Sequence, residues 1–184
     1  MNYIQALVED FTKKISLPWR DVSSDQRIFF CVYDPSEELK LRYNLTAFQI
    51  ATEEAGHRWL EYDMTHCFEE WMGKQKYREA YFQDPEKMIP TPRKFEDHIE
   101  QSFIDNTKGA DNNTLIAIIG VGNIFGFITV KEFIERLAND VDSRIVLFFP
   151  GSYSSTPTSN YRLLNAYDNW NYLATPITAD KDSF

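Results

Sequence analysis

Short apolar runs alternate along this chain with longer segments of helical periodicity, and this alternation constrains the fold more than any other feature. Runs rich in Ile, Val, Phe or Trp predict four buried strands, at Arg27–Tyr33, Arg58–Met64, Leu115–Ile119 and Arg144–Phe149. A weaker fifth strand is predicted at Tyr172–Thr178. Because Pro176 has no backbone N–H to donate, we expect this strand at a sheet edge or near a strand end.

The segments between these runs carry helix start and stop signals. After the first run, Asp34 is a good N-cap, Pro35 suits the first helical position, and Glu37 stands where a capping box places its carboxylate. An apolar stripe follows, and Gly56 supplies a stop. Further helices are predicted over Tyr3–Ile15, from Thr91 to Lys108, and from about Ile128.

A strand followed by a helix, repeated along the chain, predicts a three-layer α/β domain. Its sheet is expected to be mostly parallel with four or five strands, because each crossover returns the chain to the same edge. The 184 residues suit one domain, and no linker or repeat divides them. We therefore predict a single domain over residues 1–184, with an N-terminal helix within residues 1–16 and a frayed tail at residues 179–184.

Composition excludes several classes of protein. No apolar run reaches the roughly 18 residues of a membrane span, and the acidic start lacks the basic flank and apolar stretch of a signal peptide. Cys31 and Cys67 form neither a ligand-spaced pair nor a disulfide framework, which suits a reducing compartment. The sequence thus predicts a cytoplasmic protein without a membrane segment.

The charge pattern favours protein partners over nucleic acid. The net charge is -9 and the pI is near 4.8, whereas binding to phosphate backbones needs a surplus of Lys and Arg. Charge is nevertheless segregated, since residues 73–94 carry six Lys or Arg against three Asp or Glu. One alternative therefore stays open, in which this basic stretch touches nucleic acid within a complex through Lys74, Lys76, Arg78, Arg93 and Lys94.

In a parallel α/β sheet, ligands usually bind beyond the carboxyl ends of the strands. Four loops are expected there, beginning at Asp34, Asp63, Gly120 and Pro150. The third, Gly120-Val121-Gly122, resembles a phosphate-cradling turn in its position but has no Walker lysine. It also fails the dinucleotide pattern, because Gly126 lies one residue late. We interpret it as a tight turn that needs positive φ or a close backbone approach.

Catalytic and metal-binding patterns are equally incomplete. Asp34 and Asp63 are both expected at the carboxyl edge, where two carboxylates can hold Mg²⁺, but Asp34 already has a role as an N-cap. Asp63, His66 and Cys67 lack an evident fourth ligand for Zn²⁺. The nucleophile motif G-x-S-x-G is absent. We therefore predict no enzymatic activity, no metal and no cofactor.

The stretch Gly151–Ala166 differs in kind, because it is polar and rich in Ser and Thr but carries aromatic groups. Tyr153, Tyr161 and Arg162 are residue types that anchor protein interfaces. Two interpretations stay open here. Either these side chains are exposed for a partner, or the aromatics fold back as a lid over the sheet.

Three short motifs, each after a predicted strand, carry a family resemblance. They are Tyr33-Asp34-Pro35 with Glu38, then Gly120-Val121-Gly122, and then Phe149-Pro150-Gly151 with Tyr153. In this order and spacing the chain resembles BrxB proteins, components of bacteriophage-exclusion (BREX) defence systems, over residues 27–178. It departs from the family's usual pattern at Asp168–Thr175 and at Ser154-Ser155, which indicates a divergent branch.

The resemblance implies an intracellular protein without a recognised catalytic centre, acting beside a PglZ-type alkaline-phosphatase-like protein, a DNA methyltransferase and a large ATPase. The order of the predicted strands and helices also looks like that of a P-loop NTPase core lacking Walker motifs, which is an analogy of fold only. We expect a protein-binding scaffold subunit with a PglZ-type partner; a degenerate nucleotide-binding domain remains an alternative. The expected interface residues are Asp34, Pro35, Glu38, Gly120, Gly122, Pro150, Gly151, Tyr153, Tyr161 and Arg162.

Overall fold

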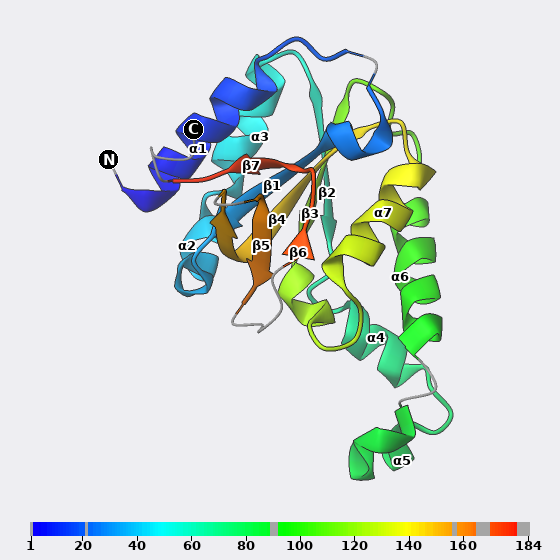
Figure 1. Ribbon diagram of the computed structural model, residues 1–184. Helices are drawn as coiled ribbons and strands as arrows, with labels where there is room; N and C mark the ends of the chain where they lie inside the picture. Colours follow the sequence, from blue (N-terminus) through cyan, green and yellow to red (C-terminus); the bar gives the residue numbers. More distant parts are fainter. Residues whose placement is uncertain (1, 21, 89–91, 156–157, 165–169, 180–184) are drawn as a thin grey trace.

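The computed structural model describes residues 2–20, 22–88, 92–155, 158–164 and 170–179. Its central sheet has the strand order β2-β3-β4-β1-β7, and neighbours on this path pair in parallel (Figure 1). The strands are β1 (Ile28–Tyr33), β2 (Arg58–Asp63), β3 (Thr114–Ile119), β4 (Arg144–Ser154) and β7 (Thr175–Ile177). The predicted α/β class with a mostly parallel sheet is confirmed.

Helices cover both faces of the sheet and complete three layers (Figure 1). One face packs against α1 (Tyr3–Ile15), α2 (Glu38–Tyr43) and α3 (Leu45–Glu54). The other packs against α4 (Cys67–Gly73), α6 (Pro92–Asn106) and α7 (Val130–Asp140). Successive side chains of β1 alternate between these two layers: Phe29 and Cys31 join the first core, whereas Phe30 joins the second. Burial on both faces explains why the strands read as unbroken apolar runs.

The helix predicted after β1 is interrupted. It consists of a 3-10 turn, η2 (Pro35–Glu37), followed by α2 and α3, which meet at Asn44. The Asp34 side chain accepts the Ser36 N–H at 2.8 Å, so Asp34 does cap this segment. The capping box does not form, because the Glu37 carboxylate pairs with Lys40 at 2.9 Å while the Asp34 N–H donates to the Tyr3 hydroxyl.

The other predicted helices are present with small shifts. The N-terminal helix α1 has the predicted bounds, and Asn2 caps it. Thr129 caps α7, which therefore starts two residues after the predicted Ile128. Sequence reasoning missed α4, α5 (Arg78–Gln83) and the short turns η1 (Ser24–Arg27), η3 (Pro85–Met88) and η4 (Val121–Ile124). The α5 helix extends away from the body of the molecule (Figure 1).

The fourth strand runs past its predicted end at Phe149. Beyond Pro150 it leaves the parallel sheet and pairs antiparallel with β5 (Asn160–Leu163), which in turn pairs with β6 (Trp170–Asn171). The weaker fifth strand is present as β7, outside β1 at the sheet edge, where Pro176 was expected. Of the predicted frayed tail, Ala179 packs against the core, and residues 180–184 lie outside the described residues.

No helix in the described part of the chain is long and apolar enough to cross a membrane.

Candidate interface at the carboxyl edge of the sheet

The sequence-predicted positions gather where the parallel strands end. Tyr33, the last residue of β1, pairs with Pro150 of β4, so the loops that follow these two neighbouring strands begin side by side. At the end of β2, the Met64 N–H donates to the Ile119 carbonyl of β3 at 2.9 Å. The loops that begin at Asp34, Asp63, Gly120 and Pro150 therefore share one edge, as the parallel topology requires.

An arginine that sequence reasoning did not single out ties this edge together. Arg42 of α2 donates through Nε to the Glu38 carboxylate at 2.6 Å and through Nη1 to Asp63 at 3.1 Å. Its Nη2 donates to the Thr65 hydroxyl at 2.8 Å. The buried Tyr33 hydroxyl donates to Glu38 in turn. We call Tyr33, Glu38, Arg42, Asp63 and Thr65 the Arg42 network.

The electrostatics of this network keep its charges paired. Burial, followed by the hydrogen bond to Glu38, raises the pKa of Tyr33 well above its ordinary range. Burial acts to raise the pKa of Asp63, but hydrogen bonds from Thr65 and the charge of Arg42 outweigh it, so the net shift is downward. At neutral pH, Tyr33 therefore keeps its proton and Asp63 is ionised. These paired charges hold α2 and the loop after β2 in fixed positions.

Close packing of the glycine turn against Thr65 explains why its first residue, Gly120, is a glycine. Gly120 adopts φ +84°, and a Cβ built there would lie 2.8 Å from both the backbone nitrogen and the hydroxyl of Thr65. Positive φ and close approach therefore both act at Gly120, in agreement with the interpretation of a tight turn. Gly122 lacks positive φ, and its Cβ would make ordinary contact with Pro150 at 3.7 Å. Of the two glycines, only Gly120 is required by the backbone.

The aromatic stretch after Pro150 folds back over the sheet. Tyr161 is fully buried, its ring meets Phe30 with centroids 4.8 Å apart, and its hydroxyl donates to the Ala174 carbonyl at 2.7 Å. The half-buried Tyr153 packs on Tyr161 at 4.9 Å. Tyr161 therefore follows the lid interpretation, because its ring fills the core under the β4–β5 hairpin. The expectation that it is exposed to a partner is corrected.

Gly151 is the residue that lets this hairpin close. A Cβ at that position would overlap the carbonyl oxygen of Arg162 and lie 2.9 Å from the Phe149 ring. Arg162 itself is exposed on β5, in register with Ser152. Tyr153 and Tyr161 point toward the protein, and Arg162 points to solvent, as strand alternation requires.

The exposed part of the edge contains two large apolar side chains that sequence reasoning missed. Leu39 is 82% exposed and Tyr43 is 89% exposed. They stand four residues apart on α2 and thus share one face, away from the buried Leu41. Asp34 and Pro35 are exposed nearby in the chain. In the sequence, Leu39 and Tyr43 are recognisable only as large apolar residues outside the stripe that contains Leu41.

The remaining predicted interface residues are covered to different degrees. Pro150 and Gly120 are buried, whereas Glu38, Gly122 and Gly151 are partly buried. These five positions shape the edge rather than form its outer surface. The basic stretch lies elsewhere, on and around α5 and at the start of α6, so it is not part of this site.

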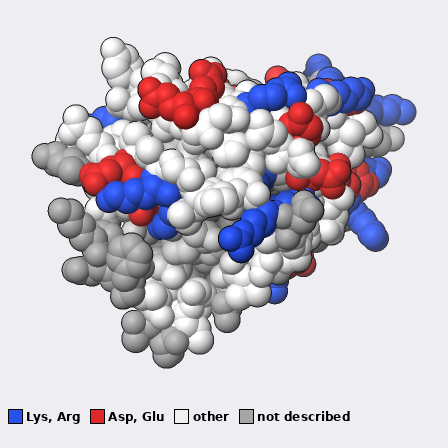
Figure 2. Space-filling view, turned by 90° about the horizontal axis from the view of Figure 1, so that it is seen from above, with Lys and Arg blue, Asp and Glu red and all other residues white. Residues whose placement is uncertain are grey.

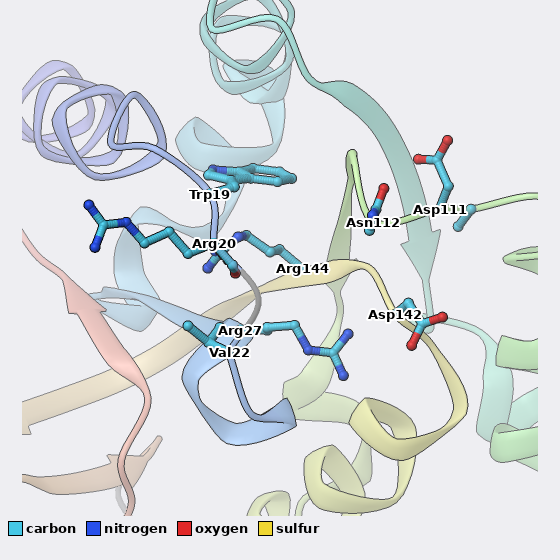
Figure 3. Close-up of a pocket in the computed structure, with 9 residues that line it drawn as sticks. Trp19, Arg20, Val22, Arg27, Asp111, Asn112, Asp142 and Arg144 are labelled. Atoms are coloured by element: carbon cyan, nitrogen blue, oxygen red, sulfur yellow. Dashed lines mark hydrogen bonds between the residues drawn. The ribbon is translucent and has the colours of Figure 1, made fainter.

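A cavity of about 630 Å³ lies at the opposite edge, where β1, β3 and β4 begin (Figure 3). Trp19, Arg27 and Arg144 contribute to its lining. Sequence reasoning missed this feature. The signal was present, because the apolar runs of two neighbouring parallel strands both open on an arginine, Arg27 and Arg144.

Fold and site together describe an α/β protein whose glycine turn serves to pack loops. The chain matches the family described as BREX protein BrxB over residues 52–176, more than half of its length, and it belongs to that family. The match includes the glycine turn and Phe149-Pro150-Gly151, while the Tyr33-Asp34-Pro35 motif precedes it. No curated protein and no solved structure matches the chain. Family membership makes this protein a component of a BREX defence system.

Proposed function

We propose that this chain is a non-catalytic, protein-binding subunit of a BREX system and that it docks a PglZ-type partner through the carboxyl edge of its sheet. The docking surface comprises Leu39 and Tyr43 on α2, Asp34 and Pro35 before it, and Arg162 on β5. We call these five residues the docking edge. We infer the partner's identity from the family, because BrxB proteins act in systems that contain a PglZ-type protein.

The observation that carries the proposal is the exposure of Leu39 and Tyr43 side by side. Burying a large apolar side chain fully contributes about 1.5–3 kcal/mol of free energy relative to leaving it exposed. Two of them on one exposed face of α2 favour a surface that a partner covers. Tyr43 and Arg162 also belong to the residue types that dominate interface energetics.

The structure under the docking edge supports a preformed surface. The Arg42 network joins α2 to the end of β2, and the Gly120 turn packs against Thr65 of the same network. Because these contacts already hold the loops, binding costs little ordering of the backbone.

The absence of catalysis is part of the proposal and has its own support. Burial raises the pKa of Cys67 to about 11 and raises that of Cys31 further, so neither thiol is a ready nucleophile. The glycine turn is occupied by packing against Thr65 and Pro150. Within residues 2–20, 22–88, 92–155, 158–164 and 170–179, which the structure describes, no group of three or more His, Cys, Asp or Glu side chains is arranged to hold a metal ion.

The test is co-purification from the native gene neighbourhood. A tagged wild-type chain is expected to retain the PglZ-type protein, and Tyr43→Ala is expected to weaken that capture roughly ten- to thirtyfold. The matched control is Tyr77→Ala, which removes another exposed tyrosine outside the docking edge. A folded wild-type bait that retains no PglZ-type protein contradicts the proposal.

A second candidate function is contact with nucleic acid through the basic stretch at residues 73–94. Tyr77 and Phe82 are exposed there, and the Lys76 ammonium lies 5.5 Å from the centre of the Tyr77 ring. Basic groups interleaved with aromatic ones are typical of surfaces that bind single strands. Charge reversal at Lys74, Lys76 and Arg78 is then expected to flatten the salt dependence of binding to a single-stranded oligonucleotide.

A further inference from the structure

A cavity at the amino edge of the sheet is lined by three arginines, Arg20, Arg27 and Arg144, and by two aspartates, Asp111 and Asp142. Arg144 opens β4 and Arg27 directly precedes β1, and these strands are neighbours in the sheet. Both side chains line the cavity together with Trp19 (Figure 3). The volume of about 630 Å³ falls within the range of small-molecule sites.

Arg144 is held firmly in place. It is only 8% exposed, and its guanidinium lies 5.0 Å from the centre of the Trp19 ring. Trp19 in turn stacks on His57 with ring centroids 3.5 Å apart and donates through its indole N–H to the Ile15 carbonyl. Arg144 also donates to the Arg20 carbonyl at 3.2 Å. The guanidinium is therefore positioned before any ligand arrives.

Arg27 is fixed from the other side. Its Nη1 donates to the carbonyls of Val141 at 2.9 Å and Ser143 at 3.2 Å, which follow the end of α7. Its Nε is buried and has no hydrogen-bond partner among the described residues. The Nε therefore has no exposed surface for a ligand, and Nη2 donates to the Ala138 carbonyl at 3.4 Å, so Arg27 contributes to the cavity chiefly through its positive charge.

The two arginines carry charge that the described residues do not neutralise. Within that part of the chain, neither Arg27 nor Arg144 forms an ion pair with a carboxylate. Asp111 lines the same cavity, but it pairs with Arg58 at 3.4 Å and accepts from Thr114 at 2.7 Å. Burial, and after it the charge of Arg27, lowers the pKa of Arg144. An anion bound in this cavity relieves the cost of holding these positive charges without a counter-charge.

We propose that this cavity binds a small oxyanion compound of the phosphate monoester class, with Arg27 and Arg144 as the charged ligands. The positive charges of the two guanidiniums match the double negative charge of a phosphate monoester. A compact anion fits better than a nucleic acid. Asp111 and Asp142 line the same cavity, and the view from above shows acidic side chains among the basic ones (Figure 2).

The test is titration of the full-length chain with inorganic phosphate, followed by calorimetry and tryptophan fluorescence. Saturable binding is expected in the wild type. Arg144→Gln and Arg27→Gln are each expected to weaken it roughly tenfold or more, because each removes a charged hydrogen-bond donor. The matched control is Arg78→Gln, an exposed arginine on α5 that is expected to leave phosphate binding unchanged.

Further arms keep the proposal open to refutation. If the buried Arg144→Gln variant does not fold, Arg20→Gln replaces it, since Arg20 is exposed and lines the same cavity. It is expected to weaken phosphate binding severalfold. No saturable binding in the wild type, or equal binding in all cavity variants, overturns the proposal. Tighter binding of malonate or of a DNA duplex than of phosphate contradicts the assigned class of ligand.

Discussion

The two edges of the sheet each carry a half-buried or buried arginine, but they use it differently. At the carboxyl edge, Arg42 meets the carboxylates of Glu38 and Asp63 and the hydroxyl of Thr65. At the amino edge, Arg144 meets the Trp19 ring and a backbone carbonyl, and no ion pair reaches it from the described residues. One arginine is neutralised within the fold, whereas the other is fixed in place without a counter-charge.

The same residue type can therefore serve two purposes, holding the structure at one edge and offering charge to a ligand at the other. A guanidinium with two carboxylate partners has its charge and donors satisfied, so it holds loops in place. A guanidinium fixed by stacking retains positive charge that a ligand can use. We therefore propose a protein-binding surface at the carboxyl edge and a site for a small anion at the amino edge.

The largest expected difference between the two edges is in the stability cost of replacing one glycine at each edge. Gly120→Ala is expected to lower the free energy of unfolding by about 3 kcal/mol, because it adds the penalty of positive φ to a clash with Thr65. Gly56 lies before β2 at the amino edge with φ +85° and open space around its Cβ position. Gly56→Ala should therefore cost only about 1 kcal/mol in the same denaturant titration. Equal costs would show that Gly120 does not pack tightly against Thr65.

The hairpin provides a second, smaller effect. Tyr161→Phe is expected to destabilise the chain by about 2 kcal/mol, because it removes the buried hydrogen bond to the Ala174 carbonyl. The control is Tyr153→Phe, whose hydroxyl lies 3.3 Å from Ser159 at a half-buried site, and its cost is expected to stay below about 0.5 kcal/mol. Urea unfolding of both variants measures the difference. A neutral Tyr161→Phe substitution would show that the hydrogen bond to the Ala174 carbonyl does not stabilise the hairpin.

The smallest effect concerns the pH dependence of the Arg42 network. Because the folded pKa of Asp63 is depressed, its contribution to stability is present above the ordinary Asp pKa of about 4 and is lost as the pH falls through the folded value. Asp63 is about half exposed, so this contribution is at most about 1 kcal/mol. The stability gap between wild type and Asp63→Asn is expected to shrink between about pH 5 and pH 2.

The control for that titration is Glu54→Gln, at the exposed end of α3, where the described residues form no ion pair. Its stability is expected to follow the wild-type curve across the same pH range. A gap for Asp63→Asn that widens toward acid would show that the folded pKa of Asp63 is raised rather than lowered.

The sequence predicted the elements whose stability is encoded locally. The strands were recognisable because burial on both faces leaves unbroken apolar runs such as that of β3. The helices α4 and α5 were missed because they span only seven and six residues, too short for a clear periodicity. The extension of β4 was missed because Pro150-Gly151 reads as a stop, whereas Gly151 in fact permits the antiparallel pairing with β5.

The candidate sites depended on contacts between distant parts of the chain. The loops at the carboxyl edge followed from topology alone, so Asp34 and Gly120 were found. Arg42 was not, because its partners Asp63 and Thr65 lie 21 and 23 residues away and nothing local marks the pairing. The cavity at the amino edge was missed for the same reason, since it joins the connection after α1 to the starts of β1 and β4.

The most direct test of the central claim measures the affinity of the purified chain for the purified PglZ-type protein from the same gene neighbourhood. We predict that Arg162→Ala at the docking edge weakens binding roughly tenfold or more, while Arg20→Ala at the amino edge leaves the dissociation constant unchanged. Wild-type stability in both variants would show that folding is intact. No measurable binding by the wild type, or an equal loss in both variants, would contradict the account.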